Sequence, residues 1–238
     1  MLVTAFASTA EPMPSSWDPT SIGTMRSETL ADRLGSGTPR TFDAREHVFC
    51  EGDLASHVYK VESGHVCIYR IVPDGRRQVI DFAYPGDIIG LGALGTHATN
   101  AQASAKSRIR CIPIATLHEV VRADQRLGLK LYEAMSRELL AAREMLFTVS
   151  QRTAAERLAA FLLALSRRNQ RRGEAANEFV LPMTRADIAD YLGLTIETVS
   201  RTFTKFRAEG MIDLEQCILV TIRDIKALVA LAEGTCET

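Results

Sequence analysis

Residues 185–201 read RADIADYLGLTIETVSR, and this stretch predicts two short helices joined by a sharp turn. Small Ala189 stands four residues before Gly193, and Val199 stands six residues after it. Two helices that cross steeply need a small residue at their contact, a glycine at the turn and aliphatic residues that lock the pair. The spacing therefore predicts a helix-turn-helix.

The second predicted helix carries polar side chains on one face, namely Glu197, Ser200, Arg201 and, one turn further, Lys205. Arginine can donate two hydrogen bonds to guanine, glutamate can accept one from cytosine, and serine can bond a base or a phosphate. This face is therefore predicted to read bases in a DNA groove. The alternative is a helical hairpin within a core, with Glu197 and Arg201 as a solvated ion pair worth about 0.3–0.5 kcal/mol.

Threonines stand where both helices are expected to begin. Thr184, with Asp187 three residues later, has the form of a capping box. Thr195 precedes the second helix, and Glu197 lies in its first turn, where a carboxylate suits the helix dipole. Thr184 and Thr195 also belong to the predicted DNA-contacting set.

The flanking segments complete a winged helix-turn-helix pattern. An apolar-rich helix is predicted over 154–166, a polar and basic connection over 167–177, a wing strand over 218–222 and a closing helix from Asp224. Arginines before, in and after the first of these helices are candidates for phosphate contacts, with a solvated helix face as the alternative. They are Arg152, Arg157, Arg167, Arg168, Arg171 and Arg172.

Short β-rich runs separated by turn signals fill residues 41–113. The strands predicted at 66–72 and 78–82 are joined through Pro-Asp-Gly at 73–75, as in a hairpin. Several strands at a spacing of roughly 8 to 12 residues predict a small sandwich or jelly roll.

A proline-free stretch over 127–149 predicts a long helix between these two regions. Its apolar or small residues recur at alternating gaps of four and three, which is the seam that two parallel helices bury against each other. The alternative is an ordinary amphipathic helix that lies on its own domain. The seam residues are Gly128, Tyr132, Met135, Leu139, Ala142, Leu146 and Val149.

Composition limits the class of protein. The chain has 238 residues, 46% of them hydrophobic and 24% charged, which is enough for two compact domains. No apolar run approaches the roughly 18 to 20 residues of a membrane-spanning helix, and the apolar opening lacks a basic n-region, so we expect a cytoplasmic protein without membrane partners. The net charge of −1 means that nucleic acid would have to bind a local patch. Five widely spaced cysteines predict free thiols.

From about 41 to 231 the chain resembles the CRP/FNR family of bacterial transcription regulators, and residues 183–211 resemble its FixK-like branch, with a Glu-x-x-Ser-Arg recognition helix. The resemblance implies an α+β fold: an N-terminal β-roll, that is, a jelly roll like those that bind cyclic nucleotides, then a long dimerisation helix and a C-terminal winged helix-turn-helix. We expect a flexible arm over 1–25, the β-roll over 26–115, the linker and dimerisation helix over 116–150, and the DNA-binding domain over 151–238.

The resemblance also implies a homodimer on a palindrome similar to TTGA-N6-TCAA, an activator that recruits RNA polymerase, and a low-oxygen programme. Glu197 and Arg201 would contact the G·C pair of each half-site, Ser200 would lie beside the outer thymine, and Ile196 would face the groove. Ala142 stands where oxygen-sensing relatives carry an acidic residue, so the dimer is expected to be constitutive. Thr202 departs from the pattern, which usually has an aliphatic residue there.

No cofactor, metal or catalytic residue is expected. Asn100-Ala101 lies near the place of the Arg-Ser pair that binds a cyclic nucleotide phosphate in relatives, and the first cysteine, Cys50, comes too late for an N-terminal iron-sulfur cluster. By the same resemblance, Cys111 stands one residue out of register for such a site. Two alternatives stay open: the same regulator gated by a small ligand or a redox signal, and a cupin-like metal enzyme, for which His65-x-Cys67 is not the required His-x-His.

Overall fold

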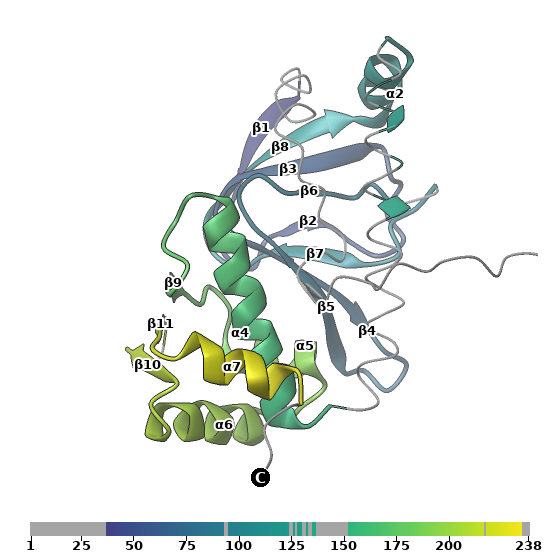
Figure 1. The fold of residues 1–238 in the computed structure, drawn as a ribbon. Helices are drawn as coiled ribbons and strands as arrows, with labels where there is room; N and C mark the ends of the chain where they lie inside the picture. Colours follow the sequence, from purple (N-terminus) through teal and green to yellow (C-terminus); the bar gives the residue numbers. More distant parts are fainter. Residues whose placement is uncertain are drawn as a thin grey trace, which may run out of the picture.

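The computed structural model describes residues 37–92, 95–123, 152–216 and 218–234, together with 126, 128, 129, 132, 135 and 136. The β-rich half comes first and a helical half with a small sheet follows it (Figure 1). Within the described part of the chain, no helix is long and apolar enough to cross a membrane.

Two four-stranded antiparallel sheets form the first half, in the orders β1-β8-β3-β6 and β2-β7-β4-β5. Buried residues from both sheets, among them Phe42, Val66, Ala101 and Ile109, share one cluster. The predicted jelly roll is therefore confirmed. The strands are β1 (Thr38–Phe42), β2 (His47–Phe49), β3 (His57–Ser63), β4 (Val66–Ile71), β5 (Arg77–Ala83), β6 (Ile88–Ile89), β7 (Asn100–Ala103) and β8 (Ser107–Pro113).

The predicted hairpin joins β4 and β5, which pair antiparallel from Val66 opposite Ala83 to Ile71 opposite Arg77. Its turn contains Gly75 at φ +83°, a left-handed conformation that favours glycine. This hairpin reaches toward the helical half of the molecule.

Helix α2 (Ile114–Ala123) follows β8 directly. Of the predicted seam, Gly128, Tyr132 and Met135 are described, and the Tyr132 and Met135 side chains are 69% and 46% exposed in the single chain. The other seam residues, Leu139, Ala142, Leu146 and Val149, lie outside the described part. The predicted arm over 1–25 also lies outside it.

The second half is a winged helix-turn-helix, as predicted. Its first helix, α4, runs to Arg171 rather than ending at 166, and Gly173 at φ +74° follows its C-cap. The 167–177 connection was therefore predicted too long. The predicted wing strand corresponds to β11, and two further strands that the sequence did not indicate, β9 and β10, complete the wing sheet in the order β10-β11-β9. The elements are α4 (Ala154–Arg171), β9 (Glu178–Val180), α5 (Arg185–Leu192), α6 (Ile196–Ala208), β10 (Ile212–Glu215), β11 (Leu219–Ile222) and α7 (Ile225–Ala232).

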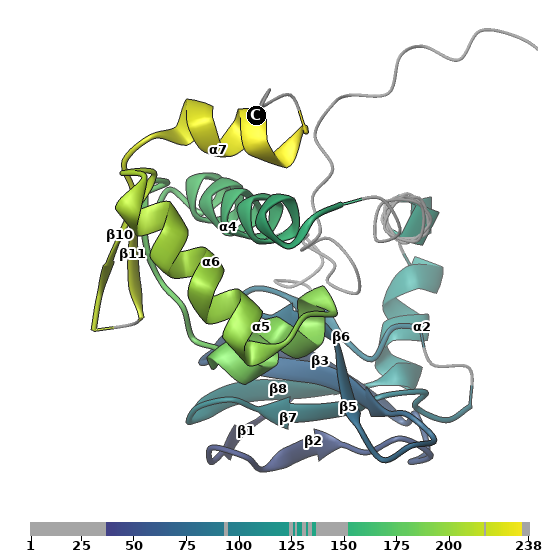
Figure 2. The same ribbon diagram turned by 90° about the horizontal axis from the view of Figure 1, so that it is seen from below.

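The two halves share a continuous buried cluster that joins β4 and β5 to α4, α5 and α6. Tyr191 of α5 lies between the halves, with its ring centroid 5.5 Å from that of Phe82 and 5.7 Å from that of Phe161. Both views place α5 beside β5 (Figures 1 and 2), and the two elements are in contact. The β-roll therefore forms one wall of the core of the helical half.

Candidate nucleic-acid interface

Helix α6 has one buried face and one face open to solvent. Val199, Phe203 and Phe206 are buried against α4 and α5, and this apolar stripe fixes which way the helix is turned. The helix runs along the lower edge of the molecule in Figure 1, away from the β-roll. The exposed residues include all those of α6 that the sequence predicted to face the groove, namely Ile196, Glu197, Ser200, Arg201 and Lys205, together with Thr204, Arg207 and Ala208.

The turn between α5 and α6 has the geometry that the sequence predicted. Gly193 ends α5 at φ +65°, where a side chain would be strained, and the Leu194 N–H donates to the Ala189 carbonyl at 2.9 Å. The Thr195 hydroxyl then accepts from the Thr198 N–H at 3.2 Å and caps α6. A closed turn and a capped start hold the exposed face of α6 in a fixed orientation.

Glu197 keeps its carboxylate ionised and available as an acceptor. Hydrogen bonds from its own backbone N–H and from the Thr195 side chain lower the pKa of Glu197, and the nearby Arg201 charge adds to this. The Arg201 Nε donates to the Glu197 carbonyl at 3.4 Å, one turn back on the helix. This surface presents an acceptor and a cation side by side, the combination that a G·C pair requires in the major groove.

Thr202, where the family pattern usually has an aliphatic residue, is accommodated in the core. Its side chain is buried, and its hydroxyl donates to the Thr198 carbonyl at 2.8 Å. Because the buried hydroxyl is satisfied within the helix, it does not disturb the packing of Val199 and Phe203.

Thr184 and Thr195 lie at the beginnings of two different helices, and both hydroxyls have capping partners. The Thr184 hydroxyl accepts from the Asp187 N–H at 3.1 Å, and the Thr184 N–H donates to the Asp187 carboxylate at 3.0 Å, which completes the predicted capping box. The Thr184 hydroxyl also donates to that carboxylate at 2.8 Å. Both threonines are exposed, so their outer sides face solvent.

Three of the six arginines that were candidates for phosphate contacts bond other parts of the chain instead. Arg168 is only 7% exposed, pairs with Asp87 of the β-roll and lies over the Tyr84 ring at 3.9 Å. Arg172 donates to the Pro85 carbonyl at 3.3 Å, and Arg157 donates to the Leu192 carbonyl at 3.0 Å. For Arg168 both readings of the sequence were wrong, since it is neither at a DNA face nor solvated.

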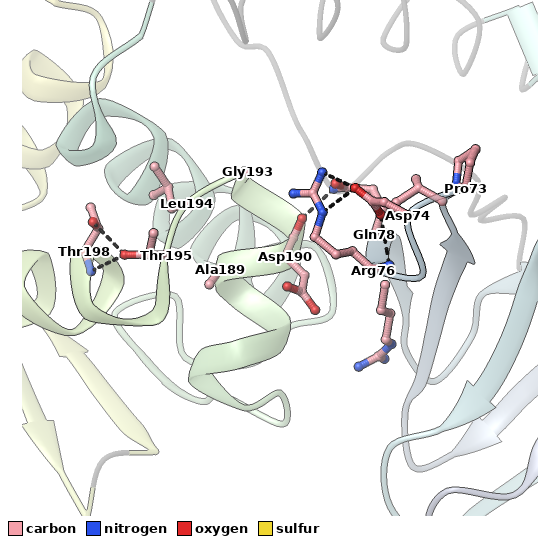
Figure 3. A pocket seen from close by; sticks show the side chains of 12 residues that line it. Pro73, Asp74, Arg76, Gln78, Ala189, Asp190, Gly193, Leu194, Thr195 and Thr198 are labelled. Atoms are coloured by element: carbon pink, nitrogen blue, oxygen red, sulfur yellow. Dashed lines mark hydrogen bonds and ion pairs between the residues drawn. The ribbon is translucent and has the colours of Figure 1, made fainter.

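A cavity of about 840 Å³ lies between the β4–β5 turn and the turn of the helix-turn-helix. Figure 3 shows Pro73, Asp74 and Arg76 of the hairpin on one side and Asp190 and Gly193 on the other. The sequence did not indicate this cavity, because its two walls are more than a hundred residues apart.

Asn100 and Ala101 of the β-roll lack the cation that would bind the phosphate of a cyclic nucleotide. The Asn100 side chain accepts from the Glu51 N–H at 3.1 Å, and Ala101 is buried, so this pair supplies no guanidinium for a phosphate. Within the described residues, no three metal-ligating side chains gather at one point. Burial raises the pKa of Cys67 to about 12 and also raises that of Cys111. Cys217 and Cys236 lie outside the described part.

Comparison with known proteins gives matches to both halves. Residues 156–231 match the Crp-like helix-turn-helix domain, and residues 39–124 match the cyclic nucleotide-binding domain. The nitrogen fixation regulation protein FixK of Bradyrhizobium diazoefficiens is 40% identical over 171 residues, which cover 72% of each chain. The transcriptional activator protein FnrA of Stutzerimonas stutzeri is 36% identical over 92% of this chain and 89% of its own.

Among solved structures, that of FixK2 from Bradyrhizobium japonicum superimposes with a TM-score of 0.76 at 33% identity, over 82% of this chain and 96% of that one. The β-roll, the winged helix-turn-helix and the exposed polar face of α6 define a DNA-binding transcription regulator. The chain belongs to the CRP/FNR family, in its FixK-like branch. Its relatives are regulators and not enzymes, so the cupin-like alternative is wrong.

Proposed function

We propose that the protein is a homodimeric transcription activator that places α6 of each subunit in successive major grooves of a palindrome similar to TTGA-N6-TCAA and recruits RNA polymerase. The observation that carries this proposal is the exposed face of α6, on which Glu197, Ser200 and Arg201 lie together on a capped, well-packed helix. These residue types match the contacts of a base-reading helix.

In the proposed complex, Glu197 and Arg201 bond the G·C pair and Ser200 lies beside the outer thymine. Ile196, which is 48% exposed at the start of α6, provides apolar contact with the groove. Lys205, Thr184 and Thr195 complete the proposed contact set.

The proposed two-fold axis follows from the DNA. A palindrome read by one helix per subunit requires two half-sites about one turn apart, and therefore a symmetric pair of subunits. Exposed Tyr132 and Met135 support a seam on the linker helix, because large apolar side chains gain stability when a second copy covers them. Leu139, Ala142, Leu146 and Val149 continue the proposed seam. The proposed divisions stay at 26–115, 116–150 and 151–238.

We further propose that the protein acts without a bound effector. Two buried thiols with raised pKa values are poor nucleophiles, which argues against Cys67 and Cys111 as oxidant sensors. The alternative is gating by a small ligand or a redox signal elsewhere in the chain. The proposed programme is low-oxygen growth, and it is supported by the names of relatives such as the anaerobic regulatory protein of Haemophilus influenzae.

Binding of protein purified in air to a fluorescent palindromic duplex, with no additive, tests the proposal. Fluorescence anisotropy at fixed salt compares this duplex with one whose half-sites are scrambled, and sedimentation measures the mass of the free protein. We expect a colourless dimer that binds the palindrome at least about a thousandfold more tightly. Equal binding to both duplexes would contradict the proposal, and binding that appears only after a ligand or reductant is added would favour the gated alternative.

A further inference from the structure

Two residues at the start of β5 reach from the β-roll to helix α5. The Arg77 guanidinium donates through Nη1 to the Asp187 carboxylate at 2.6 Å, and the Gln78 amide donates to the Asp190 carbonyl at 2.5 Å. Asp187 lies in the first turn of α5, and Asp190 follows one turn later. Two contacts a turn apart fix both the position and the tilt of a short helix, whereas one contact would leave a pivot.

Arg77 is itself held in place by the β-roll. Its Nη2 donates to the Cys67 Sγ at 2.9 Å, and its guanidinium carbon lies 4.5 Å from the centroid of the Tyr69 ring. Both partners belong to the neighbouring strand β4. The guanidinium is therefore already oriented toward α5 by the sheet and loses little freedom when it binds Asp187.

Asp187 divides its two carboxylate oxygens between two tasks. Oδ2 accepts from the Thr184 N–H at 3.0 Å and begins α5, while Oδ1 accepts from Arg77. The residue that starts the first helix of the helix-turn-helix thus also ties that helix to the other half of the molecule. Since α5 and α6 share a closed turn and one buried cluster, α6 moves with α5.

A cavity beside these contacts separates the tip of the β4–β5 hairpin from the turn between α5 and α6. The hairpin tip over 72–76 and the turn over 193–195 face each other across about 840 Å³ (Figure 3). The polar contacts of the hairpin with α5 are made by Arg77 and Gln78, which line the cavity, next to the apolar packing of Phe82 on Tyr191.

We infer that Arg77 and Gln78 are positioning residues for DNA reading: they set the angle at which the β-roll presents α6, and so the half-site spacing that the dimer accepts. The inference rests on the proposed binding of a palindrome by a dimer. Once one half-site is bound, the second binds at an effective concentration that depends on how narrowly the second α6 is held. A firmly held helix favours one spacing strongly, and a loosened helix spreads that preference over several.

The test compares the wild type with the double variant Arg77→Met, Gln78→Ala. Arg76→Met is the matched control, because Arg76 has the same charge, neighbours Arg77 in sequence, is 81% exposed and bonds Asp74 within its own turn. Arg77→Lys is the rescue variant, since it keeps a cation within reach of Asp187. Circular dichroism confirms that each variant is folded before binding is measured.

Anisotropy is recorded on an isolated half-site, on the palindrome with a six-base-pair spacer, and on palindromes with spacers one base pair shorter or longer. We expect the double variant to bind the isolated half-site as the wild type does, to bind the six-base-pair palindrome about tenfold more weakly and to lose most of its preference for that spacer. Arg76→Met keeps the wild-type pattern, and Arg77→Lys restores part of it.

A double variant that keeps the wild-type spacer preference overturns the inference. So does a variant that loses the same factor on the isolated half-site, because the two residues then support folding and not spacing. If the wild type binds the palindrome no better than a single half-site, the proposed dimer and the spacing inference fail together, and the wild-type measurement alone reveals this.

Discussion

Helices α5 and α6 begin alike and end up with opposite roles. Each starts at a threonine N-cap and carries a carboxylate in its first turn, Asp187 in α5 and Glu197 in α6. Asp187 bonds Thr184 and Arg77 and is largely covered, whereas Glu197 is exposed. A polar helix face is therefore free to read DNA only where no other part of the fold covers it.

The charged residues around the two helices also differ in whether they are covered or exposed. On the interdomain face, buried Arg168 pairs with Asp87, and Arg77 pairs with Asp187. Taking these charges from water is costly, so the loss of one partner destabilises the fold. On the exposed face of α6 the charged side chains remain hydrated and contribute little to the stability of the fold. Substitutions on the two faces should therefore separate stability from DNA binding.

The largest expected effect is on the interdomain face. Arg168→Met removes the cation opposite Asp87 and leaves a carboxylate buried, so we expect the free energy of unfolding to fall by about 3–5 kcal/mol. Urea denaturation followed by circular dichroism measures it. Arg207→Met, on the exposed last turn of α6, is the control and should change stability by no more than about 0.5 kcal/mol. Equal effects of the two changes would remove the distinction between the faces.

On the α6 face, Arg201→Ala should weaken binding to the cognate palindrome by about 1–3 kcal/mol and relax the preference at one base pair. Its free energy of unfolding should stay within about 0.5 kcal/mol of the wild type. Anisotropy with duplexes altered at the G·C pair measures the preference. A loss that is uniform across cognate and scrambled sites would show that Arg201 contacts the backbone and not a base.

A third prediction concerns pH at the interdomain face. Burial, and then the charges of Arg172 and Arg168, lower the pKa of His65 to about 4 from its ordinary 6.5. Between these values the unfolded chain binds the proton and the folded chain does not, so stability falls as the pH drops from 6.5 toward 4. Because solvent reaches part of the ring and screens it, the expected loss is about 1–2 kcal/mol.

Urea midpoints of the wild type and His65→Gln, measured across this window, check the prediction. The substitution should remove this part of the slope. Two curves that remain parallel from pH 6.5 to 4 would mean that His65 is protonated equally in the folded and unfolded chains.

The smallest expected effect is the difference of about 1 kcal/mol between the losses of stability when the two caps are removed. Thr195→Ala should cost about 1 kcal/mol of stability, the usual value for one N-cap. Thr184→Ala should cost about 2 kcal/mol, because the Thr184 hydroxyl also orients the carboxylate that binds Arg77. Thermal unfolding of both variants measures the difference. Equal losses would indicate that the capping box of α5 acts only within its own helix.

Sequence reasoning located the features that depend on short-range spacing. Ala189, Gly193 and Val199 predicted the turn between α5 and α6, and the Pro-Asp-Gly at 73–75 predicted the β4–β5 hairpin. Both follow from local steric rules, in which a glycine adopts a left-handed conformation and small residues allow close helix contact.

The interdomain contacts could not be predicted in the same way. Arg77 and Asp187 lie 110 positions apart, and although Thr184 marks Asp187 as a capping carboxylate, nothing near either residue in the sequence indicates that the two pair. Arg168 stands in a basic run that is typical of a DNA-facing helix, yet Tyr84 and Asp87 cover it. Which charged residues are buried depends on how two domains dock, and that information is spread over the whole chain.

The cluster that continues from β4 and β5 into the helical half limits how this protein can be divided. A fragment cut between the halves would expose Tyr191 and Phe161, together with the cation of Arg168, to water. Fusing this winged helix-turn-helix to a different sensor domain would therefore require strand β5 to be included, because β5 is a structural part of the DNA-binding module.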